Sequence, residues 1–248
     1  MNKLNNKTAI IIPIRMGSTR LPGKFHADIG GKPMILHIID RARETGFANI
    51  FVACDHMDHF NLVQNYGAKA IMTSSSHQSG SDRVYEALEL IDEQQNFEYI
   101  VNLQGDIPFV KPETILAVIS LLDQDQAADI ATLLATFKNI EEVKNPNFVK
   151  AVFDVNQHAL YFSRSVIPYQ MAEYQSNYYH HVGIYAYKRE ALKKFISLPQ
   201  SNLEKCEKLE QLRALENGMT IKVGFTDDLP ISVDVMEDLE NARKFSIR

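Results

Sequence analysis

Short apolar runs alternate with segments of helical periodicity through the first half of the chain. The run at residues 8–14 is continuous and rich in isoleucine, which is typical of a strand buried on both faces. Residues 34–43 instead space their apolar side chains as one face of a helix does. Strands that alternate with helices are most economically arranged as a parallel sheet with helices on both faces. The pattern therefore predicts a doubly wound α/β fold of the nucleotide-binding type.

The same patterns locate the other elements. Further strands are predicted at residues 49–54, 68–72, 99–103 and 130–136, and helices at 56–66, 82–91 and 112–122. After about residue 150 the expected elements are strands at 151–153, 159–162, 181–187 and 220–225, helices at 189–196 and 203–216, and a last helix after Asp234. We expect one domain over residues 1–248, with a smaller, partly antiparallel insertion lobe at about 150–200.

Composition restricts the class of protein. The 248 residues are 45% hydrophobic and 23% charged, which is ordinary for a globular chain. A net charge of −5 and the lack of tryptophan argue against nucleic acid as a partner. No apolar run is long enough for a membrane span and the first residues lack a secretion signal, so we expect a cytoplasmic protein with no membrane partner. The spacing of Cys54 and Cys206 does not indicate a metal site or a disulfide framework.

A basic loop follows the first predicted strand. It reads Arg15-Met-Gly-Ser-Thr-Arg-Leu-Pro-Gly-Lys24 and so carries three cations, two hydroxyls and two glycines. Open parallel sheets bind ligands at the carboxyl ends of their strands. Arg15, Arg20 and Lys24 can neutralise much of a triphosphate, while Ser18 or Thr19 can donate to phosphate oxygens. The spacing is not that of a Walker loop, and a merely solvated basic loop is the alternative.

Two acidic residues are candidates for a metal site. Gln104-Gly-Asp106 directly follows the strand predicted at 99–103, so its carboxylate belongs at the same edge of the sheet as the basic loop. Mg²⁺ favours one or two carboxylates together with substrate phosphates, and Asp234 is the second candidate. The alternatives make Asp106 a turn residue and Asp234 a helix cap.

Two further polar clusters have both functional and structural interpretations. Residues 77–83, His-Gln-Ser-Gly-Ser-Asp-Arg, form a polar loop running into a helix, which is either a ligand loop or an ordinary helix start. Within the helix predicted at 203–216, Glu207, Glu210 and Gln211 fall on one face at i, i+3 and i+4. Such a face is usually only solvated.

These motifs, taken in order, resemble the 3-deoxy-manno-octulosonate (Kdo) cytidylyltransferase family, also called CMP-Kdo synthetases. The resemblance covers nearly the whole chain. It rests on the segments at residues 12–24, 31–34, 77–80, 104–106, 159–164, 167–168, 181–185, 209–213 and 233–239.

The resemblance implies a nucleotide-diphospho-sugar transferase-like fold and a Mg²⁺-dependent transferase. Its substrates would be CTP and an acidic eight-carbon sugar, and its products CMP-Kdo and pyrophosphate, for lipopolysaccharide biosynthesis in a Gram-negative bacterium. The anomeric hydroxyl would attack the α-phosphorus in line, so catalysis is mainly positioning and charge neutralisation. Family members are commonly dimers, so we expect a homodimer.

The resemblance also assigns roles to individual residues. It implies that Arg15, Lys24, Asp106 and Asp234 are catalytic, with the two aspartates as the Mg²⁺ ligands. The nucleotide-binding residues would be Arg15, Ser18, Arg20, Lys24, Ser79, Gly80 and Arg83. The sugar-binding residues would be Gln104, Arg164, His181, Tyr185, Glu210 and Gln211.

Other activities remain open at this level. A related enzyme type accepts 8-amino-Kdo, and the segment at 169–180 lacks the basic residues that the family often has there. A cytidylyltransferase for this or another acidic sugar is therefore the main alternative. A nucleotide-binding module without turnover and a sugar-transferring enzyme are the others, and the intact acids and the triphosphate-sized basic loop argue against them.

Overall fold

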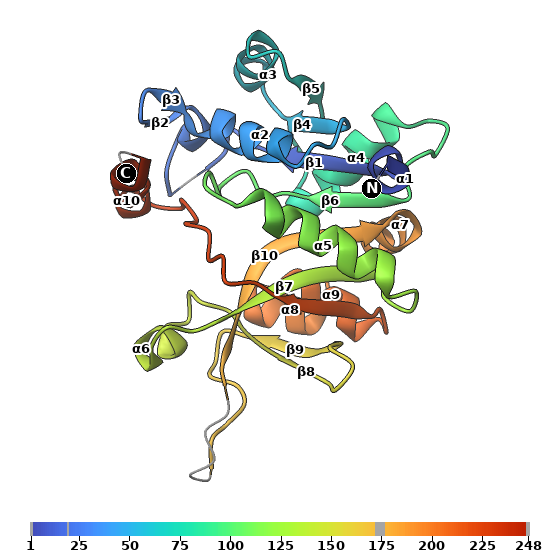
Figure 1. Ribbon diagram of the computed structural model, residues 1–248, viewed down its shortest axis with the longest axis vertical. Helices are drawn as coiled ribbons and strands as arrows, with labels where there is room; N and C mark the ends of the chain where they lie inside the picture. Colours follow the sequence, from blue (N-terminus) through green and yellow to red (C-terminus); the bar gives the residue numbers. More distant parts are fainter. Residues whose placement is uncertain (1, 19, 172–176, 247–248) are drawn as a thin grey trace. The chain divides into compact units, whose positions relative to one another are not determined.

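The computed structural model describes residues 2–18, 20–171 and 177–246 (Figure 1). Within it the chain forms two compact units. The first contains residues 1–116 and 230–248, and the second contains residues 117–229. The prediction of one domain with a lobe near 150–200 stays a prediction.

The first unit is built around four parallel strands. The sheet order is β6-β1-β4-β5. Its strands are β1 (Thr8–Pro13), β4 (Ile50–Cys54), β5 (Lys69–Met72) and β6 (Tyr99–Asn102). Its helices are α1 (Asn2–Lys7), η1 (Lys24–His26), α2 (Met34–Glu44), α3 (Met57–Asn65), α4 (Gly80–Ile91), α10 (Met236–Ser246) and the start of α5 (Pro112–Gln124), and a small hairpin joins β2 (Asp28–Ile29) to β3 (Lys32–Pro33).

The order of these strands explains where a ligand can bind. The chain runs outward from β1 to β4 and β5 and then returns past β1 to β6. Because crossovers between parallel strands are right-handed, α2 and α3 cover one face of the sheet and α4 covers the other. The direction reverses between β1 and β6, and open α/β sheets bind ligands at such a switch point. The predicted doubly wound sheet is confirmed for this unit.

Apolar side chains on both faces of β1 account for its central position. All six of its residues are buried, and Ile10, Ile11 and Ile12 have no exposed surface.

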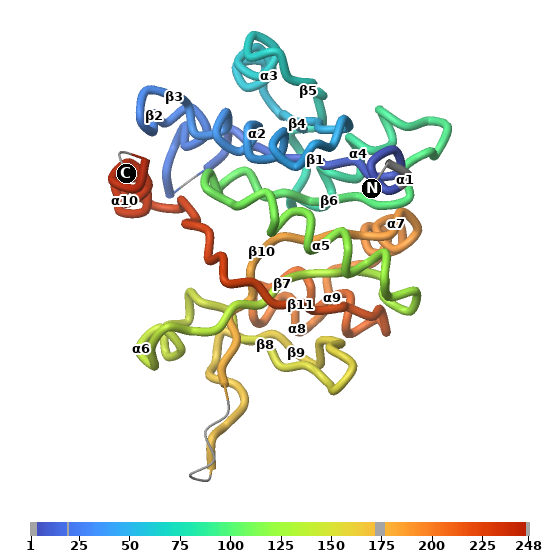
Figure 2. Tube along the Cα trace, in the orientation of Figure 1, coloured from blue at the N-terminus to red at the C-terminus, as the bar shows by residue number. Residues whose placement is uncertain are grey.

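At the end of the chain α10 packs beside the β2–β3 hairpin, as the tube in Figure 2 shows. The guanidinium of Arg243 donates to the carbonyl of Asp28 at 2.9 Å, and the tilted rings of Phe245 and Phe109 have centroids 4.9 Å apart.

The second unit mixes parallel and antiparallel pairing. β11 pairs in parallel with β7, while β7 with β10, β10 with β8, and β8 with β9 are antiparallel pairs. The strands are β7 (Ile130–Thr136), β8 (Lys150–Phe153), β9 (Ala159–Ser163), β10 (Tyr179–Lys188) and β11 (Ile221–Phe225). The helices are α6 (Ile140–Lys144), α7 (Arg189–Ser197), α8 (Asn202–Glu207) and α9 (Gln211–Glu216).

The helix predicted at 203–216 is wrong as a single element. It breaks at Lys208, which adopts left-handed backbone angles (φ 56, ψ 45), between α8 and α9. Arg213 folds back to make a bidentate pair with the buried Glu204, with distances of 2.6 and 2.8 Å. In a continuous helix, residues nine positions apart would be separated by about 13.5 Å along the axis. The break is what lets this pair form. It also means that Glu207 does not share one continuous helix face with Glu210 and Gln211.

No helix among the described residues is both long and apolar enough to cross a membrane.

The elements that periodicity missed are short: α1, η1, α6 and the β2–β3 hairpin. Segments of this length do not span enough turns or alternations to produce a clear pattern.

Close packing around Gly105 in the loop after β6 gives a stability prediction. A Cβ at this position would lie 2.8 Å from Ile14 Cγ2, 2.8 Å from Phe25 Cε1 and 3.0 Å from the carbonyl oxygen of Pro13. We expect Gly105→Ala to reduce the free energy of unfolding by about 1–3 kcal/mol, because the backbone carbonyl cannot move aside cheaply. Urea denaturation measures the free energy of unfolding of each variant. Gly17→Ala is the control, because a Cβ at position 17 meets nothing within 4 Å. Equal midpoints for the two variants would contradict this packing argument.

Candidate active site

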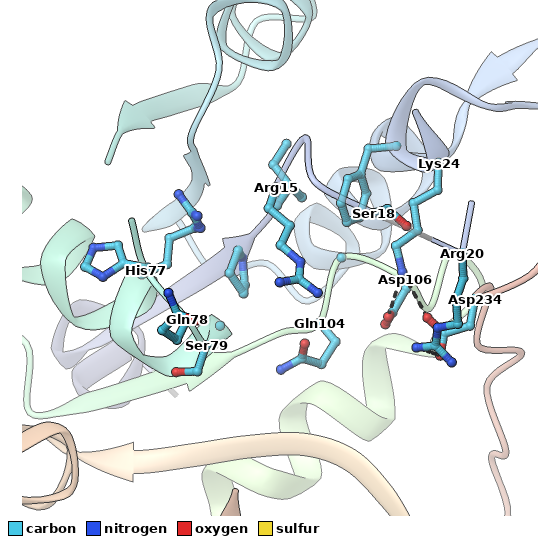
Figure 3. Close-up of a pocket in the computed structure, with 16 residues that line it drawn as sticks. Arg15, Ser18, Arg20, Lys24, His77, Gln78, Ser79, Gln104, Asp106 and Asp234 are labelled. Atoms are coloured by element: carbon cyan, nitrogen blue, oxygen red, sulfur yellow. Dashed lines mark hydrogen bonds and ion pairs between the residues drawn. The ribbon is translucent and has the colours of Figure 1, made fainter. Parts of the chain in front are cut away.

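A pocket lies in the first unit at the switch point of its sheet (Figure 3). Its walls come from the loop after β1, the loop before α4, the loop after β6 and the segment before α10. The residues that line it are Pro13, Ile14, Arg15, Ser18, Arg20, Lys24, Phe25, His77, Gln78, Ser79, Gly80, Arg83, Gln104, Gly105, Asp106 and Asp234. Every residue predicted to be catalytic, nucleotide-binding or metal-ligating is therefore in one place.

At one end of the pocket Lys24 joins the two predicted metal ligands. Its Nζ lies 3.1 Å from Asp106 Oδ2 and 3.2 Å from Asp234 Oδ1. The lysine is 8% exposed, whereas the two carboxylates are partly open to solvent. A cation held between two anions in a shielded position is strongly oriented, because the pair interactions are weakly screened there. The dashed lines in Figure 3 trace these contacts.

Backbone hydrogen bonds bring Asp234 to this position. The Val233 N–H donates to the carbonyl of Asp106 at 2.8 Å, and Lys24 Nζ donates to the carbonyl of Val233 at 3.2 Å. The start of α10 is capped by Asp238, whose carboxylate accepts the N–H groups of Asp234 and Val235. The helix-cap interpretation of Asp234 is therefore wrong: its side chain faces Lys24 while Asp238 does the capping. Asp106 lies in a turn and also contacts the lysine.

The basic loop supplies further positive charge. Arg20 makes an ion pair with Asp234 Oδ2 at 3.2 Å and is 68% exposed, so it is free to reorient toward an anionic ligand. Arg15 is exposed, and in Figure 3 its guanidinium points toward the side chain of Gln104. Ser18 lines the pocket, and its N–H donates to the carbonyl of Met16 at 2.8 Å. Thr19, the other predicted hydroxyl donor, lies outside the described residues.

The loop before α4 serves as a helix start as well as a pocket wall. Ser79 and Asp82 form a capping box, in which the Ser79 hydroxyl accepts the Asp82 N–H at 3.1 Å. Arg83 is 2% exposed, and burial lowers the pKa of its guanidinium. The guanidinium donates to Thr73 Oγ1 at 2.7 Å and to the carbonyl of Ser74 at 3.2 Å. The helix-start interpretation of residues 77–83 is confirmed, and the same capping fixes the loop that lines the pocket. The role of this loop in ligand binding stays a prediction.

Two of the polar side chains that line the pocket had no individual role assigned from the sequence. His77 and Gln78 line the pocket beside Ser79 (Figure 3). His77 Nε2 is hydrogen-bonded to Glu86, which also accepts the Ser74 N–H at 2.8 Å. Burial alone would raise the pKa of Glu86, but the hydrogen bonds from Ser74 and His77 hold it below its ordinary value. The position of His77-Gln78 directly before the helix start was the available signal.

The predicted sugar-binding residues divide between the two units. Gln104 lies in the pocket and donates to Asn102 Oδ1 at 3.0 Å. The others, Arg164, His181, Tyr185, Glu210 and Gln211, belong to the second unit. Arg164 donates through Nε to the carbonyl of Glu207 at 2.7 Å and through a terminal nitrogen to the carbonyl of Pro146 at 3.0 Å.

His181 and Tyr185 are neighbours on β10. The ring of His181 is 8% exposed, and its Nε2 is 3.0 Å from Thr132 Oγ1. Burial lowers the pKa of His181 to about 3, so the ring is neutral at pH 7. Its ring centroid is 5.3 Å from that of Tyr185, and burial raises the pKa of the Tyr185 phenol well above its ordinary value. Both side chains therefore act as neutral hydrogen-bonding groups.

The break between α8 and α9 sets the surroundings of Glu207, Glu210 and Gln211. Glu207 at the end of α8 accepts the Ser163 hydroxyl at 2.6 Å and the Arg164 N–H at 2.9 Å. Gln211, at the start of α9, is 6% exposed, and its Nε2 has no hydrogen-bond partner among the described residues. A buried amide without a partner is costly, which makes Gln211 a polar group available to a ligand.

The donor set at Lys24 fits Mg²⁺ that arrives with a phosphate ligand. The described residues contain no group of three or more His, Cys, Asp or Glu side chains that could hold a metal ion by itself. Two carboxylates, those of Asp106 and Asp234, converge on one ammonium. Mg²⁺ commonly takes one or two carboxylates and completes its octahedron with waters and substrate phosphates.

Comparison with known proteins agrees with this geometry. A family model described as cytidylyltransferase matches residues 9–221. A 3-deoxy-manno-octulosonate cytidylyltransferase from Nitrobacter winogradskyi is 49% identical over 243 residues, which cover 96% of this chain and 94% of that protein. One from Paramagnetospirillum magneticum is 47% identical over 239 residues, covering 94% and 95%.

A solved structure of a related enzyme has a closely similar fold. A CMP:2-keto-3-deoxy-manno-octonic acid synthetase complexed with CTP superposes with a TM-score of 0.92. It is 40% identical to this chain, and the match covers 97% of this chain and 98% of that one. The resemblance noted in the sequence is confirmed, and the chain belongs to the cytidylyltransferase family, within the group of 3-deoxy-manno-octulosonate cytidylyltransferases.

Proposed function

We propose that this protein transfers CMP from CTP to the anomeric hydroxyl of Kdo, giving CMP-Kdo and pyrophosphate for lipopolysaccharide biosynthesis. The observation that carries the proposal is the meeting of Lys24, Asp106 and Asp234 beside an arginine-bearing loop at the switch point of the sheet. Relatives of nearly the same length bear the name of this activity, and a relative of closely similar fold is complexed with CTP.

Charge neutralisation by the basic loop is the main catalytic contribution of this chain. The triphosphate and the departing pyrophosphate carry several negative charges, and groups already in place stabilise them without reorganisation. Arg15, Arg20 and Lys24 supply the positive charge, and Ser18 supplies a hydroxyl donor on the same loop. No covalent intermediate with the enzyme is required, because the sugar hydroxyl attacks the α-phosphorus directly.

Asp106 and Asp234 are proposed to hold Mg²⁺ together with the triphosphate. When bound, the ion would polarise the α-phosphate and lower the pKa of the attacking hydroxyl. Lys24 lies between the two carboxylates and offsets their mutual repulsion.

The remaining predicted roles concern the nucleoside end of CTP and the sugar acid. Ser79, Gly80 and Arg83, at the start of α4, are proposed to receive the nucleoside end of CTP. Gln104, Arg164, His181, Tyr185, Glu210 and Gln211 are proposed to bind the sugar acid, with the Arg164 guanidinium as the partner of its carboxylate. We further propose that the protein is cytoplasmic and acts as a homodimer.

The function is tested by supplying the purified protein with CTP, Mg²⁺ and one acidic sugar at a time. We expect pyrophosphate release and CMP-Kdo formation with Kdo, at a kcat/KM well above that with 8-amino-Kdo or a sialic acid. Product mass identifies the coupled sugar. Turnover of 8-amino-Kdo but not of Kdo would move the assignment to the related activity, and tight CTP binding without turnover of any sugar would favour a regulatory module.

Removal of single charges from the Lys24 cluster tests the catalytic roles. We expect Lys24→Ala and Asp106→Asn each to lower kcat/KM by about a hundredfold to a thousandfold, because each removes a charge that stabilises the transition state. Steady-state kinetics and thermal unfolding measure activity and folding separately. Lys7→Ala and Glu98→Gln are matched controls, since they change a lysine–carboxylate pair exposed elsewhere in the first unit. Near-wild-type turnover by both cluster variants would refute these roles.

Chelation tests the proposed metal dependence. We expect EDTA to abolish pyrophosphate release and added Mg²⁺ to restore it, because the two carboxylates need phosphate and metal together. Asp234→Asn should require a higher Mg²⁺ concentration for half-maximal activity than the wild type does. Full activity after exhaustive chelation would show that the aspartates act without a metal.

A further inference from the structure

Asp55 is hydrogen-bonded to the start of the basic loop, although neither the sequence motifs nor the proposed mechanism uses it. It follows the last residue of β4, the strand that pairs with β1 through Pro13 and Ala53. The Ile14 N–H donates to the carbonyl of Ala53 at 2.9 Å, which extends this pairing to the start of the basic loop. The Asp55 side chain is 8% exposed, so its charge is shielded from water.

The Asp55 carboxylate bonds to two walls of the pocket at once. Oδ1 accepts the N–H of Met16 at 2.9 Å, and Oδ2 accepts a guanidinium N–H of Arg83 at 3.4 Å. The Met16 amide belongs to the peptide that joins it to Arg15, so this bond fixes the backbone from which Arg15 extends into the pocket. The second bond fixes Arg83 at the start of α4.

Arg83 depends on this carboxylate because of its burial. The guanidinium is 2% exposed, and its bonds to Thr73 Oγ1 and the Ser74 carbonyl are made to neutral acceptors. Asp55 makes the largest favourable electrostatic contribution to this buried cation and Glu86 makes a smaller one, so loss of the Asp55 carboxylate leaves most of the buried charge uncompensated. The neighbouring ring of His59 has its Nδ1 3.8 Å from Asp55 Oδ1, and burial lowers its pKa to about 4. The ring is therefore neutral at pH 7 and adds no positive charge that would compete with Arg83 for the carboxylate.

We propose that Asp55 is a positioning residue for nucleotide binding, which holds the Arg15–Met16 peptide and the Arg83 guanidinium in the arrangement that receives CTP. The inference rests on the proposed nucleotide pocket and adds to it a residue that need not touch the ligand. It acts through Arg15 on the phosphate side and through Arg83 on the nucleoside side. A residue needed only for folding would instead affect stability without a selective effect on CTP.

Two substitutions separate the two bonds. Asp55→Ala removes both acceptors, whereas Asp55→Asn keeps an oxygen for the Met16 N–H and removes the charge that pairs with Arg83. Asp58→Asn is the matched control, because it removes one negative charge from an exposed carboxylate three positions along the chain. Calorimetric titration with CTP in the absence of sugar, steady-state kinetics and thermal unfolding are measured for all three variants and the wild type.

We expect Asp55→Ala to raise the Kd and the KM for CTP by about tenfold or more, since an orphaned amide and an unpaired buried cation both disturb the pocket. The KM for Kdo should stay within about twofold of the wild type, because Asp55 acts through Arg15 and Arg83, which line the nucleotide pocket. Asp55→Asn should weaken CTP binding less than the alanine variant, and Asp58→Asn should leave it unchanged.

Several results would overturn the inference. They are a folded Asp55→Ala protein with wild-type CTP affinity, an equal rise in the KM for CTP and for Kdo, or an equal loss of CTP affinity in the Asp58→Asn control. If the alanine variant does not fold, the asparagine variant decides, and wild-type CTP affinity in it would refute the role. A wild-type protein that binds CTP but does not turn over Kdo would contradict the proposed function while leaving the Asp55 comparison valid.

Discussion

The contact of one buried ammonium with two carboxylates organises the site. Lys24 is separated from Asp106 by 82 positions and from Asp234 by 210 positions, yet all three side chains meet within hydrogen-bonding distance. Like charges repel strongly when they are partly shielded from water, so a cation between the two aspartates stabilises their approach. The lysine therefore stabilises the same convergence that a metal and a triphosphate would require.

The sheet topology makes this contact possible. Because β1 and β6 are adjacent and parallel, the basic loop and the Gln104–Asp106 segment leave the sheet at the same edge. The segment before α10 is then attached to that edge by the bond from Val233 to Asp106 and capped by Asp238. Asp55, directly after β4, accepts the Met16 N–H of the same loop. Charge is thus positioned by backbone hydrogen bonds, which hold it more firmly than flexible side chains alone.

The second unit shows how a buried ion pair changes local structure. Glu204 and Arg213 come together only because the chain turns at Lys208, and that turn interrupts a segment whose periodicity is helical. It also places Glu207 against Ser163 and the backbone of Arg164. The predicted face of Glu207, Glu210 and Gln211 was wrong for this reason. Side-chain spacing reports helical preference, but it does not report a side-chain pair that can form only where the helix is interrupted.

The amino-acid sequence by itself determined the kinds of element, their order and the position of the basic loop behind a buried strand. These features depend on hydrophobic periodicity and turn residues, which act over a few neighbouring positions. Only the tertiary structure decided that Asp55 joins Met16 to Arg83 and that two distant aspartates share Lys24. Such contacts join segments remote in sequence, so no local pattern encodes them, and they exist only once the sheet has set which strand ends lie side by side.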